Sequence, residues 1–235
     1  MEVATKAVVH LSQQRGRLEN EYMRSLMNFN FGRYQSQEKE PFGTLQVFNE
    51  DTLAAGKSMS MVVEENTEVI IIPIAGTLSF KNDLGKDLFI KQGQLQLFSA
   101  ATQMSYEITN PLKNDALVNF LQIWLYKNEY PFTPHTHQFD FDLSLTNHLH
   151  KVLYPSNLHQ RAYCFIGKYD GRKKDDYVLK NKNNGVFAFV IEGIFEVQDR
   201  LLHAKDALAI WDADEIDFEA LANGAILLLL EVPCL

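Results

Sequence analysis

Short apolar runs separated by turn residues fill most of this 235-residue sequence, and they constrain its fold more than any other feature. The clearest unit is an apolar run, a glycine and a second run, as in Val69–Ile74, Gly76 and Thr77–Phe80. Runs of about four to eight residues bounded by turns are typical of strands in antiparallel sandwiches and barrels. The spacing therefore predicts an all-β protein.

The second half of the chain repeats this order. It contains the same unit of an apolar run, a glycine and a second apolar run, at Val186–Ile191, Gly193 and Ile194–Val197. In each half a turn and another apolar strand follow, at Gln94–Phe98 and at Ala207–Trp211. Self-similarity at a long period indicates a duplicated structural unit. We therefore expect two barrels of about 100–120 residues each, which is a common domain size.

The segment between the halves is less regular, and Pro131 and Pro134 mark its beginning. Leu143–Leu153 is the best helical candidate, although its period is weak and a linker is the alternative. Two His-x-His pairs fall here, and such a pair on a strand would point both rings to one face. No acidic or sulfur ligand stands at a telling spacing, so we interpret them as exposed linker histidines rather than a metal clip. They are His135, His137, His148 and His150.

Composition and charge exclude several classes of protein. Hydrophobic residues make up 46% and charged residues 22%, as in ordinary globular proteins. The net charge of -8 argues against direct binding of nucleic acid or an anionic membrane. No apolar stretch is long enough to span a bilayer, and the N-terminus lacks the apolar core of a signal peptide. Cys164 and Cys234 form no CxxC pattern, which favours a reducing, cytoplasmic location.

Blocks of sequence along the chain resemble the pirin family. Met27–Tyr34 resembles its HTFSFGxYY segment, Phe42–Asp51 its GFGALRVINED strand, and Glu68–Gly76 its MEIITYVLEG block. Leu121–Trp124 is similar to LQIW. Asp206–Asp212 is similar to the DGLAIWD strand of the shorter bacterial members, a group that includes quercetin dioxygenases. The blocks occur in the family's order and extend from about residue 25 to the C-terminus.

The resemblance implies a bicupin, in which two antiparallel double-stranded β-helix (jelly-roll) barrels are packed together. We expect an N-terminal extension over residues 1–24, an N-terminal barrel over 25–130, a connection over 131–160 and a C-terminal barrel over 161–235. In active members the resemblance implies an iron-type metal in the first barrel. Three histidines and a glutamate, from an HPHxDME segment and an HSE segment, would hold it.

The four ligand positions carry other residues in this sequence. Aligning the first segment on Glu68 places Val62 and Glu64 at its two histidines. The second segment places Tyr106 at the third histidine and Ile108 at the glutamate. Valine and isoleucine have no lone pair to give to a cation. The family metal is therefore predicted to be absent, and no other cofactor is indicated.

A slip of one or two residues in this alignment does not restore the ligands, because residues 11–134 contain no histidine. A slip would instead introduce Glu65 or Glu107, and a carboxylate cluster would favour magnesium or calcium, which is a minor alternative. The four positions then mark a pocket that is either collapsed or open to a small apolar or aromatic ligand. In the open case Glu64 and Tyr106 would be its polar anchors.

The functional hypothesis is a bicupin without a catalytic metal that binds a small molecule or acts as a regulatory protein. One alternative is a metal-dependent flavonol (quercetin) dioxygenase, and another is a protein-interaction module whose partner is a protein rather than DNA. No Gly-rich phosphate loop, GxSxG elbow or HExxH helix is present, which removes the common nucleotide-binding and hydrolase classes. Trp124 and Trp211 are expected at corresponding places in the two halves.

Overall fold

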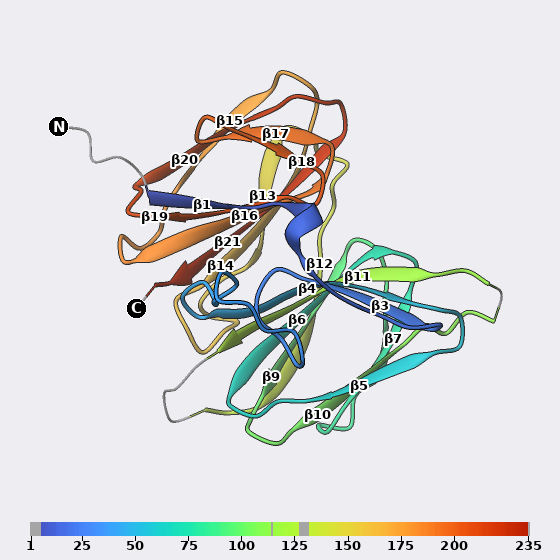
Figure 1. Cartoon of the computed structure of the whole chain (residues 1–235). Helices are drawn as coiled ribbons and strands as arrows, with labels where there is room; N and C mark the ends of the chain where they lie inside the picture. The colour runs from blue at the N-terminus through green and yellow to red at the C-terminus, as the bar shows by residue number, and fades with distance from the viewer. Residues whose placement is uncertain (1–5, 114, 127–131, 235) are drawn as a thin grey trace. The chain divides into compact units, whose positions relative to one another are not determined.

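The computed structural model describes residues 6–113, 115–126 and 132–234, and the chain divides into two compact units (Figure 1). The first barrel comprises, among these residues, 15–41, 45–113, 115–126 and 132–141. The second barrel comprises 6–14, 42–44 and 142–234. The described chain contains no helix with the length and apolar character needed to cross a bilayer.

The first barrel consists of two antiparallel sheets. Its described strands are β2 (Gly16–Glu19), β3 (Met23–Met27), β4 (Leu45–Leu53), β5 (Ser58–Val62), β6 (Thr67–Ala75), β7 (Leu78–Asn82), β8 (Asp87–Ile90), β9 (Gln94–Ala100), β10 (Ser105–Thr109), β11 (Val118–Tyr126) and β12 (His135–Asp140). The larger sheet has the order β12-β9-β6-β11-β4-β3-β2, and the smaller has the order β5-β10-β7-β8. Phe120 of the larger sheet and Phe80 of the smaller belong to one apolar core, which we call the first core.

The second barrel is built in the same way. Its described elements are β1 (Lys6–His10), the short 3-10 helix η1 (Ser12–Gln14), β13 (His148–Leu153), β14 (Tyr163–Tyr169), β15 (Lys174–Val178), β16 (Asn184–Glu192), β17 (Ile194–Val197), β18 (Arg200–His203), β19 (Ala207–Trp211), β20 (Glu215–Ala220) and β21 (Ala225–Pro233). Its sheets have the orders β1-β19-β16-β21-β14-β13 and β15-β20-β17-β18. Leu229 and Phe218, from different sheets, belong to a separate second core.

The strand orders confirm the duplication predicted from the sequence. Strands β3 to β11 of the first barrel correspond one by one to β13 to β21 of the second, and each larger sheet ends in an additional edge strand. That strand is β12 beside β9 in the first barrel and β1 beside β19 in the second. The expected equivalence of Trp124 and Trp211 was wrong, because Trp124 is on β11 and Trp211 is on β19, the counterpart of β9.

The glycine between the two apolar runs of each half is required by the backbone conformation and by close neighbouring atoms. These glycines are Gly76 and Gly193. Both have left-handed backbone conformations, with φ of 86° and 83°. A Cβ at Gly76 would lie 2.7 Å from a methyl carbon of Val118, and one at Gly193 would lie 2.5 Å from the Cβ of Ala225. Val118 and Ala225 are the first residues of the equivalent strands β11 and β21. Only glycine fits this conformation and this space, so both halves retain it.

Strands also form in the two segments expected to lie outside the barrels. β1 and β2 fall within residues 1–24, and β12 and β13 fall within 131–160. The helix considered for residues 143–153 is wrong, since β13 forms there and pairs with β14 as the edge strand of its sheet. The four histidines of the His-x-His pairs therefore lie on strands rather than in an unstructured linker. Pro131, expected to mark the break, lies outside the described residues.

Candidate functional site

The structure separates the four positions at which the sequence placed the lost metal ligands. Tyr106 and Ile108 are buried together in the first core. Val62 is 52% exposed, and Glu64 is also exposed. Neighbouring side chains of a strand point to opposite faces. Val62 lies between two residues whose side chains face the first core, so its own side chain points outward. The structure thus brings one pair of the four side chains together and leaves the other pair at the surface.

The side chains that face the first core at this place are Met61 and Val63, which flank Val62. Neither side chain has a nitrogen or a carboxylate oxygen for an iron-type cation. Within the residues that the structure describes, no group of three or more His, Cys, Asp or Glu side chains could hold a metal ion. The donors present therefore do not fit the shell of three histidines and a glutamate that the resemblance implied.

A different set of polar side chains lies in the first core, on β4, β10 and β11. We call it the interior polar cluster, and it consists of Asn49, Asp51, Tyr106, Gln122 and Trp124. Gln122 is opposite Asn49 in the register of β11 and β4, and Phe120 is opposite Asp51. Residues opposite each other in a sheet share a face. Because Phe120 belongs to the first core, the face it shares with these polar residues is the interior one.

Tyr106 holds one part of this cluster in place. Its hydroxyl donates to Oε1 of Gln122 at 2.7 Å and accepts from Nε1 of Trp124 at 2.9 Å. Its ring stacks on Phe80, with centroids 5.8 Å apart. Burial raises the pKa of Tyr106 well above its usual value, although the bond from Trp124 opposes this rise. The phenol therefore stays neutral and acts as a fixed hydrogen-bond donor.

Replacing Tyr106 with phenylalanine is expected to lower the free energy of unfolding by about 2 kcal/mol, because Trp124 and Gln122 each lose a buried partner. Denaturant unfolding measures the change. Tyr22→Phe is the matched control, since Tyr22 is an exposed tyrosine of the same barrel. Equal stability of the two variants would show that the Tyr106 hydroxyl does not stabilise the cluster.

The rest of the cluster has polar atoms without partners. Buried atoms without a protein hydrogen-bond partner among the described residues are the two amide atoms of Asn49 and the Nε2 of Gln122. The carboxyl of Asp51 is buried as well, beside the Ser25 hydroxyl. Burial raises the pKa of Asp51 to about 7, while the neighbouring Ser25 hydroxyl lowers it and Glu50 adds to the rise. Buried polar groups are almost always hydrogen-bonded. These atoms therefore indicate a polar guest, which is water or the polar end of a ligand.

The second barrel has apolar residues at four positions equivalent to this part of the first barrel. By register, the pair Gln122 and Asn49 corresponds to Leu229 and Phe165, which are both apolar. Phe120 and Asp51 correspond to a leucine and a glycine in the same way. A duplicated barrel can therefore fill these positions with apolar side chains. The polar residues of the first barrel are a specific feature of that barrel and not a requirement of the fold.

The cluster reaches the surface at Trp124, which is only partly buried. The Trp124 ring meets Phe31 edge to face, with centroids 5.5 Å apart, and Phe31 pairs with Tyr34 across a tight turn. Asn49, Asp51 and Trp124 lie in the sequence blocks that resemble the pirin family, but no site was predicted at these residues. The available signal was the placement of two polar residues at alternating positions of an apolar strand, where both face the core.

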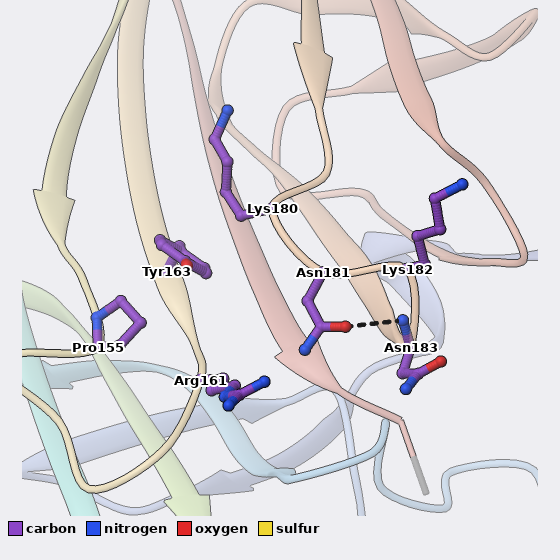
Figure 2. Close-up of a pocket in the computed structure, with 7 residues that line it drawn as sticks. All are labelled: Pro155, Arg161, Tyr163, Lys180, Asn181, Lys182 and Asn183. Carbon is purple, nitrogen blue, oxygen red and sulfur yellow. Dashed lines mark hydrogen bonds between the residues drawn. The ribbon is translucent and has the colours of Figure 1, made fainter.

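A second candidate site is a pocket of about 470 Å³ in the second barrel, which we call the mouth pocket (Figure 2). It lies at the start of β14 and at the turn between β15 and β16. Its lining residues are Pro155, Arg161, Tyr163, Lys180, Asn181, Lys182 and Asn183. The sequence predicts no site at these residues, because most of them belong to connecting segments without a recognisable motif.

Comparison with protein families gives two matches that together cover most of the chain. Residues 8–125 match the pirin model, and residues 155–232 match the quercetinase C-terminal cupin domain. A quercetin 2,3-dioxygenase of Escherichia coli K12 is 24% identical over 225 residues, which are 92% of this chain and 95% of that protein. A putative quercetin 2,3-dioxygenase of Pasteurella multocida is 23% identical over 88% of this chain and 91% of that protein.

Solved structures share the fold. YhhW from Escherichia coli has a TM-score of 0.88 and 21% identity, covering 98% of this chain and 99% of that one. The bacterial pirin YhhW in complex with nickel(II) has a TM-score of 0.87, 21% identity and coverage of 98% and 100%. A quercetin 2,3-dioxygenase from Acinetobacter baumannii has a TM-score of 0.75 at 15% identity, covering 98% of this chain and 88% of that one. These similarities establish a fold with two cupin barrels.

Proposed function

This chain belongs to the pirin family, and from that premise we propose that it is a bicupin whose first barrel binds a small hydroxylated aromatic molecule without a catalytic metal. The observation that carries the proposal is the interior polar cluster. It combines buried atoms that lack protein partners with a fixed tyrosine and a partly exposed tryptophan. A folded protein retains such groups where they bind something.

The ligand class follows from the surroundings of the cluster. Aromatic side chains form one wall, since the Tyr106 ring contacts both Phe80 and Phe98. Aromatic rings pack favourably against each other, so this wall suits a planar apolar body. The unpartnered amides of Asn49 and Gln122 suit hydroxyl or carbonyl oxygens. A polyphenol satisfies both requirements.

Absence of a metal is the second part of the proposal. The inward residues Met61, Val63 and Ile108 offer no ligand that suits iron. Asp51 contributes one carboxyl, and burial favours its protonated form. Elemental analysis of the purified protein tests this part. Stoichiometric iron, nickel, copper or manganese would overturn it.

Binding is tested with quercetin as the probe, followed by tryptophan fluorescence. The chain has two tryptophans, so a Trp211→Phe background leaves Trp124 as the reporter next to the cluster. We expect saturable quenching with one site per chain. Asn49→Leu should weaken binding at least tenfold, because it removes both unpartnered amide atoms.

Glu64→Gln is the matched control for this titration. Glu64 was the anchor expected from the sequence, but its side chain is exposed and lies outside the first core. We expect its affinity to stay within twofold of the parent protein. Loss of binding in Glu64→Gln together with retention in Asn49→Leu would place the ligand outside the interior polar cluster and overturn the proposed site.

A metal-dependent flavonol dioxygenase is the second candidate, because the relatives described above bear the name quercetin 2,3-dioxygenase. Oxygen uptake with quercetin, after addition of iron, manganese, nickel or copper, distinguishes the two functions. The proposal of a binding protein expects no metal-dependent uptake. Uptake that scales with bound metal would establish the dioxygenase instead.

We also propose a cytoplasmic location. Its support is the state of the two cysteines, Cys164 and Cys234, which are both free thiols. Free thiols are typical of reducing compartments, where disulfides are rare. Localisation of a tagged full-length protein by cell fractionation tests this.

A further inference from the structure

We propose that the mouth pocket of the second barrel binds a small aromatic anion, through an acidic group that is a carboxylate or a phosphate. This proposal is independent of the ligand in the first barrel. The pocket, about 470 Å³, has the size of small-molecule sites, which are about 300–1,000 Å³. β-Barrels commonly bind ligands at their mouths.

The charges that line the mouth pocket favour an anion. Arg161, Lys180 and Lys182 are three of its seven lining residues, and no lining residue is acidic. The whole chain carries 30 acidic and 22 basic residues, so its average surface would give the opposite sign. A concave patch of one charge raises the local concentration of oppositely charged ligands.

Arg161 and Tyr163 form one wall. Arg161 is exposed, whereas Tyr163 is partly buried with its side chain packed against the second core, and both line the pocket (Figure 2). The guanidinium group of arginine can bind a carboxylate or phosphate with two parallel hydrogen bonds. Within the described chain no ion pair is formed by the Arg161 side chain. The Tyr163 ring beside it offers a surface for an aromatic body.

The opposite wall is a turn held in a fixed conformation by Glu231. This fully buried carboxylate accepts hydrogen bonds from the backbone N–H groups of Lys180 at 2.9 Å and Asn181 at 3.0 Å. It also accepts bonds from the Tyr177 hydroxyl and from Nδ2 of Asn184. The turn is therefore formed before a ligand arrives, which lowers the entropy lost on binding.

Asn181 adds a directed donor to this wall. Its Oδ1 accepts a hydrogen bond from the backbone N–H of Asn183 at 3.1 Å, as the dashed line in Figure 2 shows. That bond fixes the amide orientation and places its Nδ2 on the Arg161 side (Figure 2). A ligand anion between the two walls can accept hydrogen bonds from both.

Two carboxylates near the pocket are already engaged. The oxygens of Glu231 are used by the four donors of the turn. Asp214 is paired with Lys182 at 3.7 Å, and the Lys180 ammonium lies 5.1 Å from the centre of the Tyr177 ring. Asp214 therefore offsets the charge of Lys182, Lys180 supplies positive potential at the rim, and Arg161 is the cation left to contact the ligand.

The mouth pocket lies at a position of the second barrel that corresponds to the candidate site of the first barrel. By register, Tyr163 and Glu231 correspond to Val47 and Trp124 of the first barrel. Trp124 marks the end at which the interior polar cluster reaches the surface. The two barrels thus present their candidate sites at equivalent ends, although the side chains that form them differ in chemistry.

Isothermal titration calorimetry of the full chain tests the proposal with salicylate and phenyl phosphate as probes. We expect one site per chain for at least one probe, with an affinity that falls as the salt concentration rises. The tighter probe identifies the acidic group. Inorganic phosphate and phenol, which each lack one half of the proposed ligand, should bind at least tenfold more weakly.

Arg161→Gln should weaken binding of the tighter probe at least tenfold. Arg172→Gln is the matched control, since Arg172 is an exposed arginine of the same barrel outside the pocket, and its affinity should change less than twofold. Tyr106→Phe should also leave this affinity unchanged, which separates the pocket from the first barrel. No binding of either probe, or equal losses in the two arginine variants, would overturn the proposal.

Discussion

Replacing Glu231 with alanine is expected to lower the free energy of unfolding of the second barrel by about 3–5 kcal/mol. Glu231 is fully buried and accepts hydrogen bonds from Tyr177, Asn184 and two backbone N–H groups. Its removal leaves these buried donors unpaired and opens a cavity. Burial and the contact with Glu231 both raise the pKa of Tyr177, so its hydroxyl cannot ionise to adapt.

Guanidinium unfolding followed by Trp211 fluorescence measures this loss, in a Trp124→Phe background that leaves one reporter. Trp211 packs edge to face on Phe42 within the second barrel, so its emission follows the folding of that unit. Glu231→Gln keeps the volume and one acceptor and should lose less. Glu192→Ala, at an exposed glutamate of β16, is the matched control. A loss below about 1 kcal/mol in Glu231→Ala would contradict this account of the turn.

Replacing Asp51 with asparagine is expected to change the pH dependence of stability of the first barrel. Burial raises the pKa of Asp51 from 3.8 to about 7 in the folded state. Between these two values the unfolded chain releases a proton that the folded chain keeps, so the stability of the parent protein falls as pH rises. The shift of about three units corresponds to roughly 4 kcal/mol at most. Asparagine removes this contribution because it does not titrate.

The measurement is the difference in unfolding free energy between Asp51→Asn and the parent protein at pH 4 and at pH 8. We expect this difference to move in favour of the variant by about 3 kcal/mol between the two pH values. Asp115→Asn is the control, since Asp115 is exposed in the same unit. A difference that does not vary with pH would show that Asp51 ionises normally in the folded protein.

The sequence predicted the architecture because its signals are local. Alternating apolar runs and the two glycines at left-handed turns identify strands and their order, and these signals are repeated in the second half. The motif blocks then placed the chain in its family, which the family comparison confirmed. The edge strands β1 and β12 were missed because their apolar pattern is weak, and pairing with distant strands stabilises them.

The candidate sites depended on information that the sequence does not contain. A shift of one residue reverses the side of a strand that a side chain faces, and the motif alignment could not fix the register at β5. Val62 and Glu64 were chosen for that reason, whereas Met61 and Val63 face the core. The sequence by itself determined the two barrels and the absence of histidine from residues 11–134, whereas the structure adds His135 and His137 to the first barrel through β12. Only the tertiary structure decided which polar groups meet, because Asn49, Tyr106 and Gln122 become neighbours through strand pairing and the packing of one sheet on another.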